Sequence, residues 1–302
     1  MLARVTNSMM NNNLLEALNQ TQQGQNNALT QVETQLRVNL PSDDPAAAAL
    51  YSTSLAVSAQ NTQYLQNINS LNGNMQVGDA ALSSAVSILN RAITLGTEGG
   101  NGTLSASDEH SLGQEVGQLQ QQMLGVANST FQGNAIFAGT ASGPAYVADA
   151  SSPDGVSYQG NTNVNQVEIA AGSKVPVNVP GSQIFQNGSG SVFQALQDLK
   201  TALASNDPAA AQTAVNGINA ALSQLSQQRV FYGSTIDRLN STQAVLNNEQ
   251  TALTQQQTTL VGADMATSIT QLYSAEVARS AILAAGARLS QISLLTQAPT
   301  VG

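Results

Sequence analysis

The chain has 302 residues, of which only 9% are charged, and its formal net charge is −9. Because Lys174 and Lys200 are the only lysines, the sequence offers no basic patch to hold a phosphate backbone, and we expect no nucleic-acid partner. Cysteine is absent and His110 is the only histidine, so disulfides, thiolate metal sites, multi-histidine metal sites and catalytic triads cannot be built within one chain.

The N-terminal segment carries a heptad stripe whose middle is polar, at Gln22 and Gln25. A stripe repeating every 3.5 residues predicts a helix that packs against a partner, but one this polar is weak alone. The apolar members, which we regard as assembly residues, are Leu15, Leu18, Leu29, Val32 and Leu36. The segment shows no secretory signal pattern, and the chain has no stretch of about 20 apolar residues that could span a membrane.

Two prolines at 41 and 45 bracket Ser42, Asp43 and Asp44 and mark a firm break. The two carboxylates could be an acid–base pair or bind calcium, but capping of a helix that starts at Pro45 explains them more simply. That helix shows a second heptad stripe, including Leu71, Leu82 and Leu89, and glycines at 96–102 stop it.

A shorter helix follows, capped near Ser107 and ending before Gly133. His110 lies in its first turn, where an exposed polar residue is expected. Between residues 139 and 190 the heptads give way to glycine, proline and alternating β-branched residues, which predicts a small β-rich insert. Residues 155–159, 166–170 and 174–179 are its expected strands, with a hairpin turn at Ala171-Gly172-Ser173. A short helix covering 193–203 follows the insert.

The most regular stretch covers residues 207–260, where Asp207-Pro208 is a helix start signal. Its seam includes Leu239, Leu246, Leu253 and Leu260, and predicts a helix of roughly 80 Å in a coiled coil or long bundle. Seam positions also hold Gln243, Gln250 and Gln257, which form either a polar ladder to another subunit or a wet part of the bundle.

Past residue 262 a last amphipathic helix begins, with an apolar stripe and alanines between its members. We expect it to pair with the N-terminal helix, both being loose in the monomer. The stripe residues, which we regard as assembly residues, are Met265, Ile269, Leu272, Ile282, Leu289, Ile292 and Leu295.

Together these patterns predict a mainly α rod of long antiparallel helices in a coiled coil or bundle. Residues 1–40 and 263–302 are its paired terminal helices, 41–138 and 191–262 its long-helix bundle, and 139–190 its β-rich insert.

Several motifs resemble bacterial flagellins. In the N-terminal half they are Val5-Thr6-Asn7-Ser8-Met9-Met10, residues 36–39 followed by 41–46, residues 67–69 and residues 79–82. In the C-terminal part they are residues 263–266 and 293–295. Gly133-Asn134-Ala135-Ile136-Phe137-Ala138-Gly139-Thr140, with 156–160 and 177–181, resembles the hook-filament junction proteins, the third hook-associated proteins of that superfamily. Thr34-Gln35 stands where this family often has Ser-Gly, which implies a less flexible break.

The resemblance implies a structural, non-catalytic subunit without cofactors, placed in the extracellular flagellum and exported without a cleaved signal peptide. Its implied partners are a hook-side junction protein, flagellin, further copies in a ring, and an export chaperone that binds the region from Met265 to Leu295.

Three alternatives remain open. A minor flagellin would polymerise into the filament itself. An enzyme carried on the insert is disfavoured because the insert lacks histidine and cysteine. A surface adhesin would bind through the insert, with Tyr146, Tyr158 and Phe185 as candidate contacts, although a small folding core accounts for these aromatics equally well.

Overall fold

The computed structural model describes the backbone of residues 2–187 and 190–297 and the side chains of residues 9–186 and 190–288. It divides into two compact units. We call Met1–Ala59 with Glu249–Gly302 the terminal unit, and Gln60–Asn248 the central unit. The predicted mainly α fold with a small β-rich insert is confirmed.

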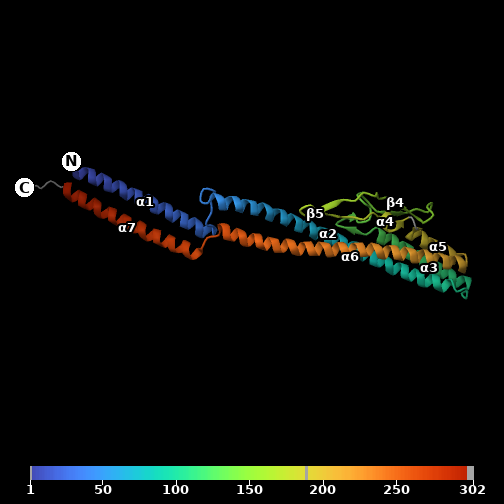
Figure 1. The fold of residues 1–302 in the computed structure, drawn as a ribbon. Coiled ribbons are helices and arrows are strands. Elements are labelled where there is room, and N and C mark those ends of the chain that lie inside the picture. Colours follow the sequence, from blue (N-terminus) through green and yellow to red (C-terminus); the bar gives the residue numbers. More distant parts are fainter. Residues whose placement is uncertain (1, 188–189, 298–302) are drawn as a thin grey trace, which may run out of the picture. The chain divides into compact units, whose positions relative to one another are not determined.

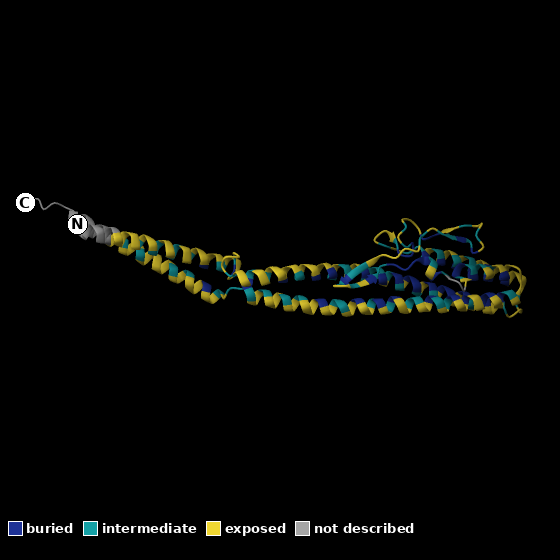
Figure 2. Cartoon of the chain, turned by 45° about the horizontal axis from the view of Figure 1, so that its top comes forward, coloured by how far each residue is buried: buried dark blue, intermediate teal, exposed yellow. Residues whose placement is uncertain are grey.

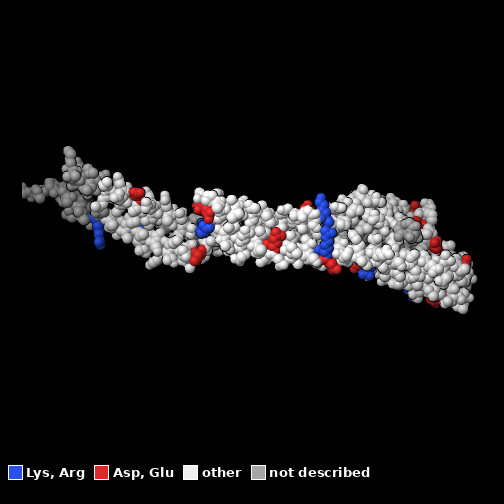
Figure 3. All heavy atoms as spheres, in the orientation of Figure 1, with Lys and Arg blue, Asp and Glu red and all other residues white. Residues whose placement is uncertain are grey.

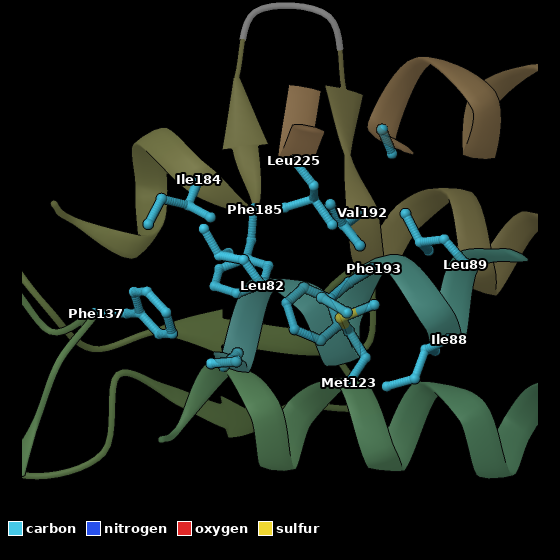
Figure 4. Packing of buried hydrophobic residues seen from close by; sticks show 14 of the residues in the cluster. Leu82, Ile88, Leu89, Met123, Phe137, Ile184, Phe185, Val192, Phe193 and Leu225 are labelled. Carbon is cyan, nitrogen blue, oxygen red and sulfur yellow. The ribbon is translucent and has the colours of Figure 1, made fainter. Parts of the chain in front are cut away.

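Four helices build the central unit: α2 (Pro45–Gly99) and α6 (Pro208–Val261), which both also contribute to the terminal unit, and α3 (Ala106–Ala127) and α5 (Val192–Ala204). Their apolar faces enclose one continuous core, which Figure 4 shows around Leu82, Met123 and Phe193. The predicted seam residues Leu71, Leu82, Leu89, Leu239 and Leu246 all lie buried in this core.

Side-chain caps explain where these helices begin. The Asp207 carboxylate accepts from the backbone N–H groups of Ala209 and Ala210, both at 3.0 Å, ahead of α6. Ser191 caps α5 by accepting from the N–H groups of Phe193 and Gln194. The expected cap of α3 near Ser107 is two residues off, because the Ser105 hydroxyl is the group that accepts from the Asp108 N–H, at 3.2 Å.

Within the described residues the β structure consists of four two-stranded antiparallel sheets. They pair β1 (Thr130–Phe131) with β2 (Asn134–Ala135), β3 (Tyr146–Ala148) with β4 (Val156–Tyr158), β5 (Gln166–Ala170) with β6 (Ser173–Pro176), and β7 (Gln186–Asn187) with β8 (Gly190–Ser191). A four-residue helix, α4 (Gly181–Ile184), precedes β7. The predicted hairpin is confirmed, although Ser173 already belongs to β6 and only Ala171 and Gly172 form the turn.

Aromatic side chains hold the insert onto the helices. Tyr146 packs its ring on Tyr158, Phe185 and Phe193, with centroid distances of 5.0, 5.8 and 5.2 Å. Tyr146 and Phe185 are buried, so the idea that they are surface contacts of an adhesin is wrong. Tyr158 is half-buried, and its hydroxyl donates to main-chain carbonyl oxygens within the insert.

The Tyr232 side chain of α6 packs directly against α2. A Cβ added at Gly78 would overlap the Tyr232 ring, so only glycine lets the ring lie against the α2 backbone. One turn away, Arg229 forms an ion pair with Asp79 at 3.0 Å. Burial raises the pKa of Tyr232 well above its ordinary value.

The glutamine seam neither faces another subunit nor lies only against solvent, the two roles that its sequence pattern left open. Gln243 donates to the Asn69 side chain at 3.0 Å in the central unit. In the terminal unit Gln250 donates to Ser58 at 2.6 Å and Gln257 to Ser54 at 3.1 Å. All three amides therefore bind α2 of the same chain, and the seam between α6 and α2 is partly polar.

A second, much smaller apolar cluster lies in the terminal unit, where Val38, Ala47 and Val261 are buried. Leu260 packs against this cluster while half-buried. Asp44 caps α2 by accepting from the Ala47 N–H at 3.0 Å, which confirms the capping interpretation. Asp43 accepts instead from the N–H groups of residues 39 and 40 and so orders the preceding turn.

Candidate assembly surface of the terminal unit

Helices α1 (Leu2–Thr34) and α7 (Met265–Gln297) run side by side and antiparallel, as Figures 1 and 2 both show. The pairing that the sequence predicted is thus present. Both helices are poor in charge, and their polar positions are mostly Asn, Gln, Ser and Thr.

Main-chain hydrogen bonds fix the two helices at their inner ends. The Ala263 N–H donates to the Gln35 carbonyl at 2.9 Å, and the Arg37 N–H donates to the Val261 carbonyl at 2.7 Å. Gln35 lies in the left-handed region with φ of 60°, which favours glycine. The glutamine that replaces the expected glycine therefore holds a conformation that costs it energy.

Carboxylates cap the starts of α2 and α7 beside this junction. Asp264 accepts from the Thr267 hydroxyl and from the N–H groups of Ala266 and Thr267, and these bonds lower its pKa. The Ala47 N–H and the Arg37 guanidinium, 3.2 Å away, lower the pKa of Asp44 in the same manner. Both helix starts therefore depend on ionised carboxylates.

Small, polar and apolar side chains share the face between α1 and α7. Ala28 is only 2% exposed, and the buried Ser268 hydroxyl donates to the Gln31 side chain at 3.2 Å. Near the outer end a Cβ added at Gly286 would lie 3.0 Å from Leu14. The contact leaves part of the apolar surface of both helices exposed.

The predicted N-terminal stripe is split between this face and solvent. Leu18, Val32 and Leu36 are half-buried, whereas Leu15 and Leu29 are exposed.

The C-terminal stripe divides similarly. Met265, Leu272 and Ile282 are half-buried, and Ile269 is 53% exposed. The side chains of the other three predicted residues lie outside the described part: Leu289, Ile292 and Leu295.

Further apolar side chains, which the sequence reading missed, extend the exposed surface. On α7 they are Tyr273, Val277 and Leu283 beside Ile269, and on α1 Met9 and Met10. Spacings of four, four and six residues place the α7 group within roughly a third of the helix circumference. Searching the α7 sequence for apolar residues outside the heptad seam would have found this group. We call the set Leu15, Leu29, Ile269, Tyr273, Val277 and Leu283 the open apolar face.

An open apolar face of this kind can bind other amphipathic helices, because covering it removes apolar area from water. Figure 3 shows few charged side chains on the side of the molecule that it draws, but Glu276 falls within the same third of the α7 circumference as Ile269, Tyr273 and Val277. Among the described helices none is long and apolar enough to cross a membrane.

The residue types that could carry catalysis or bind a metal are not grouped into a site among the described residues. His110 is exposed and contacts the Gln114 side chain at 3.2 Å. Within residues 9–186 and 190–288 no three His, Asp or Glu side chains are grouped so that they could hold a metal ion.

Comparison with known proteins places these helices in a family. Residues 5–142 match the bacterial flagellin N-terminal helical region, and residues 215–297 match the bacterial flagellin C-terminal helical region. These matches include α1 and α7 together with most of the long helices. The chain belongs to the bacterial flagellin family.

Individual relatives agree with this assignment. The flagellar hook-associated protein 3 of Salmonella typhimurium is 30% identical over 161 residues, covering 52% of this chain and 49% of that protein. A flagellin of Listeria monocytogenes is 24% identical and covers 85% of both chains. The flagellar junction protein of Legionella pneumophila, 16% identical, covers 70% of this chain and all of its own, with a TM-score of 0.58. The alignment thus spans about half the length of the Salmonella protein.

Proposed function

We propose that this chain is a structural subunit at the junction between the hook and the filament of the bacterial flagellum. Its supporting observation is the open apolar face on the paired helices α1 and α7. Exposed apolar side chains grouped on paired helices indicate a surface that neighbouring subunits cover. The likeness to a hook-associated protein 3 and to a solved junction protein supports the same role.

In this proposal the hook-side junction protein and flagellin cover the open apolar face from its two sides, and further copies of the chain complete a ring. The half-buried stripe residues such as Leu18 and Leu272 hold α1 and α7 together. Exposed residues such as Leu29 and Tyr273 contact the neighbouring subunits. The role requires no catalysis and no cofactor.

The same surface needs protection before assembly. We propose that an export chaperone covers the region from Met265 to Leu295 until the chain leaves the cell through the flagellar export channel, without cleavage of a signal peptide. Ile269, Tyr273 and Val277, exposed and on one side of α7, are the described residues that such a chaperone would cover.

Replacing three residues of the open apolar face tests the proposal. In a pull-down with the full-length chain, we expect the triple variant to lose binding of both flagellin and the hook-side junction protein. This variant carries Ile269→Ser, Tyr273→Ser and Val277→Ser. A matched control replaces Val230 and Val245 by Ser, since these residues are exposed on α6 of the central unit. Circular dichroism checks that both variants remain helical.

The proposal is contradicted if the triple variant binds both partners as the wild-type chain does. It is also contradicted if the control variant loses binding to the same extent, because the contact would then not belong to α1 and α7.

A second candidate function is a minor flagellin that forms the filament itself, which the 85% coverage of the Listeria flagellin favours. The two roles differ in self-assembly. A purified junction subunit is not expected to form filaments even when seeded, whereas a flagellin is expected to polymerise. Electron microscopy of the seeded, purified chain therefore distinguishes the two roles.

A further inference from the structure

A cavity of ≈ 390 Å³ lies in the central unit between α2 and the start of the insert. Its wall comes from α2 at residues 67–74, the β1–β2 hairpin, residues 139–142, and β5 with the segments on either side of the β5–β6 hairpin. Its volume falls in the range of pockets that hold small ligands. The assembly role proposed above does not use it.

No charged side chain lines this cavity. Its lining polar groups are five asparagines, with glutamine, serine and threonine: Asn67, Ser70, Asn74, Gln132, Asn134, Thr140, Ser142, Asn165 and Asn178. A ligand carrying phosphate, sulfate or carboxylate would find no cation to pair with here, and an ammonium group would find no carboxylate. The lining therefore selects for an uncharged polar molecule.

Part of this lining already serves the fold. Asn178 accepts from the Asn165 N–H at 2.9 Å and donates to the Asn163 carbonyl at 3.0 Å. Asn67 donates to the Glu168 carbonyl at 2.9 Å. These bonds hold the insert segments in place, so the cavity has fixed walls.

The other amides make no hydrogen bond within the protein. Among the described residues, the side chains of Asn74, Asn134 and Asn165 have no protein partner, nor do the hydroxyls of Ser70 and Ser142, and all of these except the half-buried Asn74 are exposed to solvent. Each amide offers two donors and an acceptor with two lone pairs, so together they present both kinds of group around one space. Adjacent hydroxyl groups on a ring each need a donor and an acceptor, which this arrangement supplies.

Phe131 adds an aromatic surface to the wall. Its ring lies against the α2 backbone, since a Cβ added at Gly73 would be only 3.0 Å from Cζ. The hairpin turn after Phe131 places Gln132 at a φ of 50° and Gly133 at 82°, which brings Asn134 back beside the ring. An aromatic ring next to free amides matches a ligand with an apolar C–H face and a hydroxyl rim.

We propose that this cavity is a binding site for a neutral carbohydrate, one or two pyranose rings in size. The C–H face of the sugar packs on Phe131, and its hydroxyl groups exchange hydrogen bonds with Asn74, Asn134 and Asn165. The site would let the flagellar structure contact a neutral glycan, a role separate from assembly through α1 and α7.

Saturation-transfer difference NMR on the full-length chain tests this proposal. The probes are neutral oligosaccharides built from glucose, galactose, mannose or N-acetylglucosamine, with sialylated and sulfated glycans as the charged comparison. At least one neutral probe is expected to receive saturation, strongest at the C–H protons of one ring face. The charged glycans are expected to receive none.

Variants assign the signal to the cavity. Asn74→Ala together with Asn165→Ala is expected to weaken binding roughly thirtyfold, since each lost hydrogen bond is worth roughly 1 kcal/mol and 1.4 kcal/mol is tenfold. The control is Asn216→Ala, an exposed helical asparagine on α6 outside the cavity, which is expected to leave affinity unchanged.

Three outcomes overturn the proposal. In the first, no neutral probe receives saturation, and in the second, the double variant binds its probe as tightly as the wild-type chain does. In the third, a protein partner slows hydrogen exchange around Asn74 and Phe131 while no sugar does, which would make the cavity part of a protein interface.

Discussion

The same heptad pattern along α6 has different outcomes in the two units. Leu239 and Leu246 are buried in the central unit, whereas Leu253 and Leu260, one and two heptads further on, are only half-buried in the terminal unit. In the central unit α3, α5 and the insert add walls to the seam. The comparison teaches that a heptad seam predicts a face, while the number of neighbouring elements decides how far that face is buried.

The largest expected effect comes from removing a core ring of the central unit. Phe193→Ala should lower the free energy of unfolding of that unit by about 3–5 kcal/mol, because Phe193 is fully buried among Tyr146 and Phe185. Ile269→Ala in the terminal unit is the matched comparison and should cost under about 0.5 kcal/mol. Denaturant unfolding followed by circular dichroism measures both, and similar losses would contradict the comparison.

Helical glycines give the next effect. Gly78→Ala should destabilise the central unit by about 1–3 kcal/mol, because the new methyl group overlaps the Tyr232 ring and this outweighs the gain in helix propensity. Gly125→Ala on α3 is the control, since a Cβ there meets no atom within 4 Å. It should stabilise by up to about 1 kcal/mol. Thermal unfolding should show a lower melting temperature for Gly78→Ala and a higher one for Gly125→Ala. Shifts in the same direction would show that packing at Gly78 is loose.

The two units should differ in their response to pH. Burial raises the pKa of Tyr146 and Tyr232 in the central unit. A raised pKa contributes stability below the unfolded value, near 10, that is lost as pH rises through the folded value. Denaturant melts above pH about 10 should therefore show a loss of stability that Tyr232→Phe reduces.

In the terminal unit the direction is opposite. The lowered pKa of Asp44 and Asp264 contributes stability above the unfolded value, near 3.9, that is lost as pH falls through the folded value. The protection factors of amides at the starts of α2 and α7, which correct for the slower intrinsic exchange in acid, should fall as the pH is lowered, and less so in Asp264→Asn. An acid response confined to the central unit would contradict this difference.

The polar seam offers a smaller change. Gln257→Leu alone should leave stability nearly unchanged, because it adds an apolar group to the seam but deprives the buried Ser54 hydroxyl of its partner. Adding Ser54→Ala should stabilise the terminal unit by about 1 kcal/mol. A double-mutant cycle by thermal unfolding measures the coupling, and additivity of the two changes would show that the hydrogen bond contributes nothing.

The smallest effect is expected at the end of α1. Gln35→Gly relieves the left-handed backbone at φ of 60°, but the extra freedom of glycine in the unfolded chain offsets part of the gain. The net stabilisation should be a few tenths of a kcal/mol to about 1 kcal/mol. Thr34→Gly, at the last residue of α1, is the control and should destabilise, as fraying measured by hydrogen exchange at residues 30–35 would report.

Most of the helical architecture could be predicted from the sequence, because its signals are local. Asp44-Pro45 and Asp207-Pro208 start helices where a carboxylate meets backbone N–H groups, and the seam leucines repeat at a fixed interval. The hairpin at Gly172 follows from equally local turn chemistry.

What could not be predicted depends on contacts between distant segments. The partners of Gln243, Gln250 and Gln257 lie on α2, nearly two hundred residues away in sequence, so the heptad pattern left two other interpretations open. The burial of Tyr146 requires rings from three separate elements. The open apolar face consists of side chains that the pairing of α1 and α7 leaves exposed, and a heptad stripe alone does not show which of its members that pairing covers.

Hydrogen exchange on the full-length monomer, repeated with the hook-side junction protein and then with flagellin, tests the central claim most directly. We predict slow exchange in the central-unit parts of α2 and α6 and fast exchange in α1 and α7, with only α1 and α7 slowing when a partner is added. Equal protection of both units in the monomer, with no change on adding either partner, would contradict an assembly role for the open apolar face.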